Sequence, residues 1–558
     1  MKRFFNFRNI LIGFFLLNLL QAFFTPIAKD EAYYWMFSQN IDWGYFDHPP
    51  MVALLIKLGY SLFQNELGVR LMTTILSILT CIILWQLVEI EDREKKNSKI
   101  IFLLFIIALP LFNVYGFITT PDAPLLFFST LYLLVFNRFT VKKSWINTLL
   151  VGSTAALLMY SKYHGALVIL FALASNISVL RTLHFYLAGI IGLLLFSPHL
   201  YWQYTNDFVT FNYHLIHRAS GPFKSEYFFN YLLNIFIVLN PVLFVVVVIQ
   251  WIKKNKYAQI PHQLKWLFWG FIGFFAFNSF RDHVEPHWLA VCSIPMVLSL
   301  HKLYLNTKPL QKQLKTLIFI SLSLILVLRV FLILPITIIK SEFHYDKKDY
   351  YSAIQEIANG EKVAFVNSYQ NAAKYTFYTS DSAFSYNCVS SRKNQYDLWD
   401  YENNYHNENV YIVGNWPSSW FEKDTLKNGR EILFNRAKNF PMINKLKFKL
   451  EHPINISLTD TSKFEVTITN PYNRTINFVG EQYPIRMRVY FRKDGKYDYY
   501  FYANLNVQQL PPNSTTVASA SLFIPQKVNP GNYQLEFTVK PGYLYDVIVS
   551  EPIPFKVN

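Results

Sequence analysis

The first 340 residues consist mostly of long apolar runs separated by short polar stretches. A helix needs about 20 residues to cross the hydrocarbon core of a bilayer, and several of these runs reach or approach that length. We therefore predict about eleven transmembrane helices, near residues 9–28, 70–88, 100–118, 123–137, 146–161, 165–180, 184–200, 228–252, 264–280, 288–301 and 316–339.

The pattern changes after Lys340, where runs of this length stop. In 341–444, a helix-like stretch at 350–357 precedes short apolar strands at 363–366 and 409–413, which predicts a small α/β domain. In 445–558, apolar and polar residues alternate in runs separated by turn residues. This alternation is typical of antiparallel strands, and we predict a β-sandwich of immunoglobulin type. The predicted fold class is thus a polytopic α-helical membrane protein, residues 1–340, with two C-terminal domains outside the membrane.

The composition is that of a membrane protein, and the net positive charge lies mostly in the membrane part. Of the 558 residues, 52% are hydrophobic and 18% aromatic, and the formal net charge is +16. The chain is too apolar for an ordinary soluble protein of this size. Residues 1–340 hold 28 Lys and Arg against 14 Asp and Glu, whereas the remainder holds 24 against 22. Because the basic excess belongs to the membrane part, nucleic-acid binding is not its natural explanation.

The positions of the basic residues predict the orientation, because Lys and Arg in short loops are retained on the cytoplasmic side. Eighteen of the 28 basic residues fall on one side of the predicted helices, and ten of the 14 acidic residues fall on the other. The basic groups lie at 2–8, 93–99, 138–143, 181, 253–256 and 302–315. An odd number of spans then places both C-terminal domains outside the cytoplasm.

Four polar segments share the predicted non-cytoplasmic face. They are the opening loop, which contains Lys29 to Trp35 and Asp42 to Pro50, and the shorter stretches Thr119 to Pro124, Ser161 to Gly165 and Arg281 to Trp288. Charged groups are costly to hold near hydrocarbon, so such a cluster is a functional-site hypothesis. Its carboxylates, imidazoles and cations suit a reaction with an anionic leaving group and a proton to be removed.

Each segment also has a plainer interpretation. Carboxylates favour helix N-termini, so Asp30 and Glu31 could simply begin an interfacial helix, and Asp122 between two prolines could be a helix cap. Lys162 could extend to lipid headgroups. The fourth segment, with two histidines and a glutamate, could bind a metal ion or supply ordinary interfacial polarity. Taken singly, no segment decides between these interpretations.

The residue sequences of these segments and their order along the chain together resemble those of a known family. Asp30-Glu31-Ala32-Tyr33-Tyr34-Trp35, Gly44-Tyr45-Phe46-Asp47-His48-Pro49-Pro50-Met51, Pro121-Asp122-Ala123-Pro124-Leu125-Leu126 and Ser161-Lys162-Tyr163-His164-Gly165 resemble the GT-C superfamily of membrane glycosyltransferases. The branch that looks most alike contains the protein mannosyltransferases and aminoarabinose transferases of bacteria. The resemblance covers roughly residues 10–300, and the two C-terminal domains add no such match.

The resemblance implies a transferase that takes a sugar from a polyprenyl-phosphate-linked donor on the outer, periplasmic or extracellular, face of a cytoplasmic (inner) membrane. The acceptor would be an envelope glycan, a lipid, lipid A or a protein. In that family an aspartate of the first external loop acts as the base, which matches Asp30, and the Asp-x-Pro-Leu aspartate matches Asp122. The aminoarabinose branch has Glu-Lys before Pro-Pro, where this chain has Asp47-His48.

The chemistry of the residues agrees with that implication. A direct displacement at the sugar needs a base for the acceptor and positive charge near the departing phosphate, and it inverts the anomeric carbon. The predicted catalytic carboxylates are Asp30, Glu31 and Asp122. The residues predicted to bind the donor phosphate or substrate are Asp47, His48, Lys162, His164, Arg281, His283, Glu285 and His287. A divalent metal ion held by Asp47 or Glu285 with His283 is a further possibility.

A transporter or flippase of lipid-linked saccharide would need similar spans, charged pockets and aromatic belts. Transporters usually show internal repeats or paired broken helices, and the sequence shows neither. A third interpretation makes the outer domains a scaffold that binds a glycan or an envelope partner, and it is compatible with catalysis.

Overall fold

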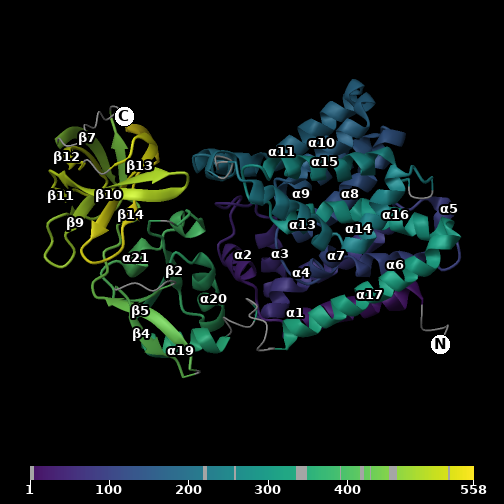
Figure 1. Cartoon of the computed structure of the whole chain (residues 1–558), viewed down its shortest axis with the longest axis horizontal. Coiled ribbons are helices and arrows are strands. Elements are labelled where there is room, and N and C mark those ends of the chain that lie inside the picture. Colours follow the sequence, from purple (N-terminus) through teal and green to yellow (C-terminus); the bar gives the residue numbers. More distant parts are fainter. Residues whose placement is uncertain are drawn as a thin grey trace. The chain divides into compact units, whose positions relative to one another are not determined.

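The computed structural model describes residues 6–557, except 218–222, 257–258, 335–342, 344–347, 390, 415–419, 428, 452–460 and 526–527. The chain divides into two compact units, Met1–Lys347 and Lys348–Asn558, which are described separately (Figure 1). The boundary predicted near Lys340 lies outside the described residues.

The first unit is helical. Its helices are α1 (Phe7–Phe24), α2 (Lys29–Gln39), α3 (Met51–Tyr60), α4 (Glu66–Trp85), α5 (Ile90–Arg93), α6 (Ser98–Ala108), α7 (Pro110–Val114), α8 (Asp122–Val141), α9 (Trp145–Ser161), α10 (Gly165–Ser175), η1 (Ile177–Arg181), α11 (Leu183–Thr205), α12 (Val209–Phe211), the π-helix η2 (Asn212–His217), α13 (Ser225–Val238), α14 (Pro241–Ile252), α15 (His262–Asn278), η3 (Pro286–Cys292), α16 (Ser293–Asn306) and α17 (Lys308–Ile333). Its core includes the fully buried Phe102, Leu133, Phe268 and Leu303.

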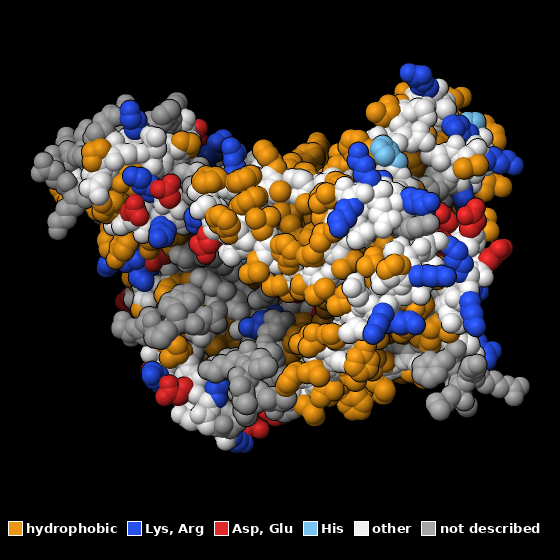
Figure 2. Space-filling model, turned by 45° about the vertical axis from the view of Figure 1, so that its right-hand side comes forward, with side chains coloured by type: hydrophobic (Ala, Val, Ile, Leu, Met, Phe, Trp, Pro, Cys, Tyr) orange, Lys and Arg blue, Asp and Glu red, His pale blue; other side chains and the backbone are white. Residues whose placement is uncertain are grey.

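By length and composition, six stretches of the described residues are suited to crossing a membrane, or seven if one bent pair counts as a span. The six are α1, α4, α8, α11, η3 with α16, and α17; the bent pair is α13 with α14. The surface agrees, because Figure 2 shows a broad band of hydrophobic side chains across this unit. A multi-pass membrane protein is therefore confirmed, whereas the count of eleven spans is not.

Two of the predicted spans are broken, and proline explains both breaks. The single span predicted at 228–252 is two helices that meet at 97°. Asn240 has φ of 67° at the corner, and Pro241 has no N–H to continue the helix. The span predicted at 100–118 ends at Ala108 and resumes as α7 at Pro110. The residue before proline is disfavoured in helical conformation, and Leu109 is extended there.

Helix α9 packs closely between α8 and α11. Gly152 makes the contact with α11 possible, since a Cβ at this position would lie 2.6 Å from the carbonyl oxygen of Ala188. This packing matters for the site, because α8 begins, α9 ends and α11 ends next to the polar segments identified above.

The second unit begins with an α/β layer. Its helices are α19 (Lys348–Ala358), α20 (Tyr369–Thr379), η4 (Gln395–Asp397) and α21 (Glu402–Tyr405), and its strands are β1 (Lys362–Val366), β2 (Ala383–Tyr386), β3 (Val410–Val413), β4 (Glu422–Thr425) and β5 (Glu431–Ala437). The strand order is β2-β1-β3-β5-β4. β1 is parallel to β2 and β3, whereas β5 is antiparallel to β3 and β4.

The rest of the unit consists of β6 (Lys447–Leu450), β7 (Thr461–Asn470), β8 (Ile476–Asn477), β9 (Ile485–Lys493), β10 (Lys496–Leu505), β11 (Gln509–Leu510), β12 (Ser514–Phe523), β13 (Gly531–Pro541), β14 (Val547–Ile548) and β15 (Ile553–Val557). Most of them form one sheet in the order β14-β13-β9-β10-β12-β7-β6, with β15 on β13 and a separate β8–β11 pair.

This sheet curls until its two ends meet. Three strands separate β7 from β13, yet the rings of Phe464 and Phe537 lie 5.9 Å apart across the interior. The backbone N–H of Phe448 in β6 also donates to the carbonyl of Val549, directly after β14, at 2.7 Å. A sheet-rich C-terminal region is thus confirmed, whereas the separate facing sheets of an immunoglobulin-type sandwich are not.

Candidate active site

A buried ion pair joins two of the polar segments. α8 begins at Asp122, and α9 ends immediately before Lys162. The Lys162 ammonium donates to both carboxylate oxygens of Asp122, at 2.7 and 2.8 Å, and both side chains are buried. The Lys162 ammonium also lies 6.0 Å from the ring centroid of Trp288. Such a pair is stable in a dry environment only while both partners remain.

His287 adds the fourth segment to this pair. Its Nε2 atom lies 3.7 Å from an oxygen of Asp122, and its side chain is 40% exposed. Asp30 also interacts electrostatically with His287, and His48 with Asp122. Charged groups of all four polar segments therefore interact with one cluster.

Asp30 and Glu31, although adjacent, have different environments. Asp30 is exposed in the first turn of α2, whereas Glu31 is fully buried. The Glu31 carboxylate accepts hydrogen bonds from Arg70 Nε at 2.8 Å, from the Thr119 N–H at 2.8 Å and from the Ala28 N–H at 3.0 Å. These contacts tie together α2, α4 and the segment before α8.

Arg70 was not among the predicted site residues. Its guanidinium pairs with both Glu31 oxygens and donates to the backbone carbonyls of Ala22, Thr25 and Pro26. All of these partners lie in or next to the opening loop. The signal was present in the sequence, because an arginine inside an apolar span is itself a functional-site hypothesis.

The second part of the opening loop is held by the end of α11. His199 Nδ1 lies 2.6 Å from the carbonyl oxygen of Trp43. A carbonyl only accepts, so Nδ1 carries the proton and Nε2 accepts from the Tyr163 hydroxyl at 2.8 Å. Trp202 Nε1 donates to Asp42 at 2.7 Å. His199 and Trp202 also escaped prediction, because they lie within an apolar run with no distinctive motif.

Gly44 allows this close approach. A Cβ at Gly44 would lie 2.4 Å from the indole ring of Trp202, so any larger residue would displace the ring or the loop.

Asp47 and His48 stand directly before the two prolines of the opening loop, and each has a polar partner. Asp47 is buried, and its backbone carbonyl accepts from His214 Nε2 at 3.0 Å. His48 Nε2 and the Tyr34 hydroxyl are 3.2 Å apart.

His164 differs from the other predicted ligands of the phosphate. Its ring packs edge-on against Phe275 and Trp288, at centroid distances of 5.1 and 5.0 Å. Desolvation, followed by the nearby charge of Lys162, lowers the pKa of His164 well below its ordinary value. The imidazole is therefore neutral at physiological pH and forms part of the wall of the site rather than a cationic contact.

The remaining predicted residues lie between α15 and η3. Arg281 and His283 are exposed, and His283 Nε2 is 3.9 Å from a carboxylate oxygen of Glu285. Within the described parts of the chain, no group of three or more His, Cys, Asp or Glu is arranged to hold a metal ion. Asp47, His283 and Glu285 are thus not gathered into such a group among the described residues.

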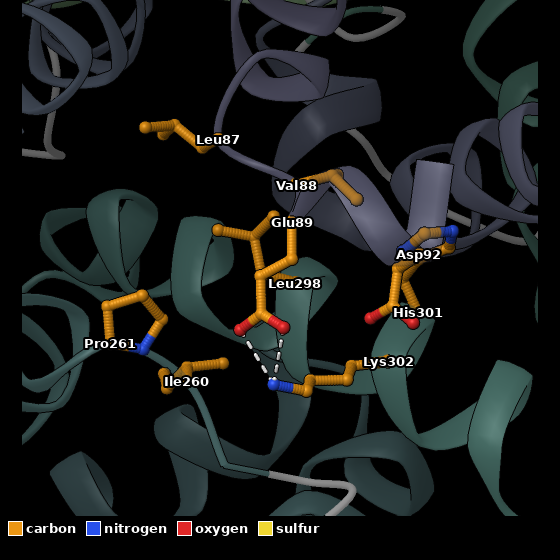
Figure 3. A pocket seen from close by; sticks show the side chains of 9 residues that line it. All are labelled: Leu87, Val88, Glu89, Asp92, Ile260, Pro261, Leu298, His301 and Lys302. Atoms are coloured by element: carbon orange, nitrogen blue, oxygen red, sulfur yellow. Dashed lines mark hydrogen bonds and ion pairs between the residues drawn. The ribbon is translucent and has the colours of Figure 1, made fainter. Parts of the chain in front are cut away.

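A small pocket lies elsewhere in the membrane unit (Figure 3). Its polar lining residues are Glu89, Asp92, His301 and Lys302, and the Lys302 ammonium donates to both oxygens of Glu89 at 2.6 and 2.8 Å. Lys302 is at the end of α16, whereas His287 precedes the start of that helix. The pocket and the candidate site are thus at opposite ends of the same helical segment.

Sequence comparison finds relatives of part of the membrane unit. The family model described as dolichyl-phosphate-mannose-protein mannosyltransferase matches residues 47–202. The chain is 27% identical over 218 residues to the lipid A galacturonosyltransferase RgtD of Rhizobium johnstonii, covering 36% of this chain and 44% of the relative. It is 29% identical over 146 residues to an uncharacterized protein of Aquifex aeolicus, covering 25% and 27%. The chain thus spans less than half the length of these curated relatives.

Solved structures share the fold. The apo structure of ArnT from Cupriavidus metallidurans superposes with a TM-score of 0.57 at 12% identity, covering 76% of this chain and 97% of that chain. The structure of the same protein bound to undecaprenyl phosphate gives 0.53 at 12% identity, covering 77% and 97%. At this identity the structural likeness concerns the fold, and the family-model match includes Asp47, Asp122 and Lys162. The chain is thus similar in sequence, over residues 47–202, to the dolichyl-phosphate-mannose-protein mannosyltransferase family, and it is similar in fold to ArnT.

Proposed function

We propose that this protein transfers a sugar from a polyprenyl-phosphate-linked donor to an acceptor of the cell envelope, which is lipid A, another lipid, a glycan or a protein. The observation that carries the proposal is that His287 lies 3.7 Å from Asp122 of the buried Asp122–Lys162 pair, with the charges of Asp30 and His48 near enough to act on these two residues. Two similarities support it: one relative is named as a lipid A galacturonosyltransferase, and one structure with this fold holds undecaprenyl phosphate.

In the proposed reaction Asp30 is the base. Its carboxylate takes the proton of an acceptor hydroxyl, the hydroxyl oxygen attacks the anomeric carbon, and the bond from that carbon to the phosphate oxygen breaks. The electron pair leaves with the polyprenyl phosphate. A single displacement of this kind inverts the anomeric configuration, because no covalent sugar intermediate forms.

The departing phosphate needs positive charge close to it. Lys162 is largely neutralised by Asp122, and His164 is uncharged, so we assign this role first to Arg281, His283 and His48. In this proposal Asp122 and Lys162 position His287 and the N-terminus of α8, and Glu31 positions α2.

We further propose that the site faces the periplasm or the cell exterior at a cytoplasmic membrane. Asp122 begins α8 and Arg138 lies near its end, while His287 and Lys302 lie at opposite ends of η3 with α16. The polar cluster and the basic loops are therefore at opposite ends of the same helices. The retention of basic loops in the cytoplasm supports this orientation.

The test uses the full chain in liposomes with polyprenyl-phosphate sugars extracted from the producing cells and labelled in the sugar. We expect a new glycosidic product, detected by mass spectrometry, with an anomeric configuration opposite to that of the donor by NMR. Transport of the labelled lipid without any glycosidic product would favour the transporter alternative. Comparison of envelope lipids and glycans from a deletion strain would identify the sugar and its acceptor together.

A further inference from the structure

The curled sheet of the second unit exposes three aromatic side chains side by side on its outer face. Tyr500 and Tyr502 in β10 and Phe523 in β12 are 51%, 47% and 52% exposed. β10 and β12 are paired with Ala503 opposite Leu522, so Tyr502 lies beside Phe523. We call these three residues the aromatic platform.

The platform is separate from the hydrophobic core. Side chains alternate between the two faces of a strand, and the inward neighbours Ala503 and Leu522 are buried. The platform rings point the other way. Adjacent exposed aromatic residues of this kind mark binding surfaces more often than isolated exposed ones do.

The tyrosine rings of the platform are held in place before any ligand arrives. Tyr500 stacks on Tyr490 of β9, with ring centroids 5.2 Å apart and an interplanar angle of 27°. The Arg488 guanidinium lies 4.7 Å from the Tyr500 centroid and 4.4 Å from that of Tyr502. Arg488 is itself fixed by Asp546 at 2.9 Å. Preorganised rings lose little conformational entropy when a ligand binds.

Two ion pairs lie on the same face of the sheet beside the platform. Arg488 pairs with Asp546, and Arg492 pairs with Glu536 at 3.2 Å. The Tyr497 hydroxyl also donates to Glu536, at 2.5 Å. A ligand with apolar faces and hydroxyl groups at its edges complements flat rings bordered by guanidinium and phenol hydroxyl groups.

We propose that the aromatic platform binds a saccharide chain of the cell envelope. Sugar rings would stack through their C–H faces on Tyr500, Tyr502 and Phe523, while their hydroxyl groups bond to the part-exposed Arg492 and to the phenol hydroxyls of the two tyrosines. Tyr500 and Tyr502 are two positions apart on one strand, a span of about 7 Å. This site is additional to the proposed transfer site, and it does not depend on the transferase activity.

The experiment is saccharide titration of the full chain in lipid nanodiscs, followed by calorimetry and saturation-transfer NMR. The probes are cellohexaose, laminarihexaose, mannohexaose and the delipidated saccharide released from the producing cells. We expect saturable binding of at least one probe. The double substitution Tyr500→Ala with Tyr502→Ala, and separately Phe523→Ser, should weaken it about tenfold or more.

Val517→Ser is the matched control. Val517 is 57% exposed on the same face of β12, six residues from Phe523, which is about 20 Å along a strand. Binding should be unchanged in this variant, and thermal midpoints should agree among all variants. Sugar transfer to a small soluble acceptor should also be unchanged in Tyr502→Ala, so a failure of this proposal is distinguishable from a failure of the transfer proposal.

Three results would overturn the inference. One is that no probe binds the wild-type chain, and another is that the platform variants bind as tightly as wild type. The third is that the substitutions change the oligomeric state, measured by mass photometry, without changing saccharide binding. The platform would then be a contact between copies of the chain.

Discussion

Asp122 accepts two hydrogen bonds from the ammonium of Lys162, at 2.7 and 2.8 Å, although 40 residues separate them in the chain. The pair connects the start of α8 to the end of α9, and His287 lies 3.7 Å from the same carboxylate. A buried pair of this kind both stabilises the helix ends and sets the local charge of the site.

Removing one partner of this pair should destabilise the protein. Asp122→Asn leaves the Lys162 ammonium buried beside a neutral group, which we expect to cost about 3–5 kcal/mol of unfolding free energy. The apolar double substitution Asp122→Leu with Lys162→Met should recover much of that stability without recovering activity. Thermal unfolding in detergent and the transfer assay measure the two effects. If Asp122→Asn were as stable as wild type, the buried pair would not stabilise the fold.

Asp30→Asn should lower the rate of transfer and leave stability unchanged. The side chain is exposed, and loss of a general base costs about 10²–10⁴-fold in rate. Glu66→Gln is the matched control, because Glu66 also lies in the first turn of a helix, α4. Wild-type turnover by Asp30→Asn in correctly folded protein would remove Asp30 from the role of base.

Arg70→Lys should destabilise the protein even though the positive charge is kept. The guanidinium bonds to Glu31 and to three backbone carbonyls at once, whereas an ammonium has three donors at a single point. We expect a loss of about 3 kcal/mol in stability, because buried partners are left unsatisfied. Arg181→Lys, at an exposed arginine, should have no effect on the thermal midpoint. A midpoint for Arg70→Lys equal to that of this control would refute the assignment.

Gly44→Ala should disturb the opening loop through Trp202. The added methyl group would meet the indole at 2.4 Å, and overpacking of this kind costs about 1–3 kcal/mol. Combining it with Trp202→Leu should give a smaller loss than the sum of the two single losses, measured as a double-mutant cycle by thermal unfolding. Gly13→Ala is the control, since nothing lies within 4 Å of a Cβ there. Additive losses would show that the two residues do not touch.

The second unit should lose stability in mild acid through His406. Desolvation, followed by the charge of Arg474, lowers the pKa of His406 to about 4, below its ordinary value of about 6.5. As the pH falls from about 7 to about 5, the unfolded chain takes up this proton before the folded chain does, so the unfolding free energy decreases. His406→Gln should therefore lose less stability than wild type over this range, measured by unfolding at several pH values. His262→Gln, at an exposed histidine, should follow the wild-type curve; if His406→Gln does so too, the interpretation is wrong.

Much of the candidate site could be predicted because its polar residues are unusual in their surroundings. Asp30, Asp122 and Lys162 each interrupt apolar sequence next to a predicted span. The different roles of Asp30 and Glu31 could not be predicted, because they depend on which carboxylate turns toward Arg70. His199 and Trp202 were missed for a related reason: their partners, the Trp43 carbonyl and Asp42, are identified only by the packing of α11 against the opening loop.

By itself, the sequence determined that the first 340 residues belong to a membrane, that an α/β layer and a strand-rich region follow, and which segments carry polar chemistry. Hydrophobic periodicity and charge are local properties, and they can be read without knowing any contact. The tertiary structure alone decided that the helix pair α13–α14 turns at Asn240, that the sheet closes through Phe448 and Val549, and that Lys162 meets Asp122. These features depend on contacts between residues far apart in the chain or on how a break is accommodated by packing, which no local pattern specifies.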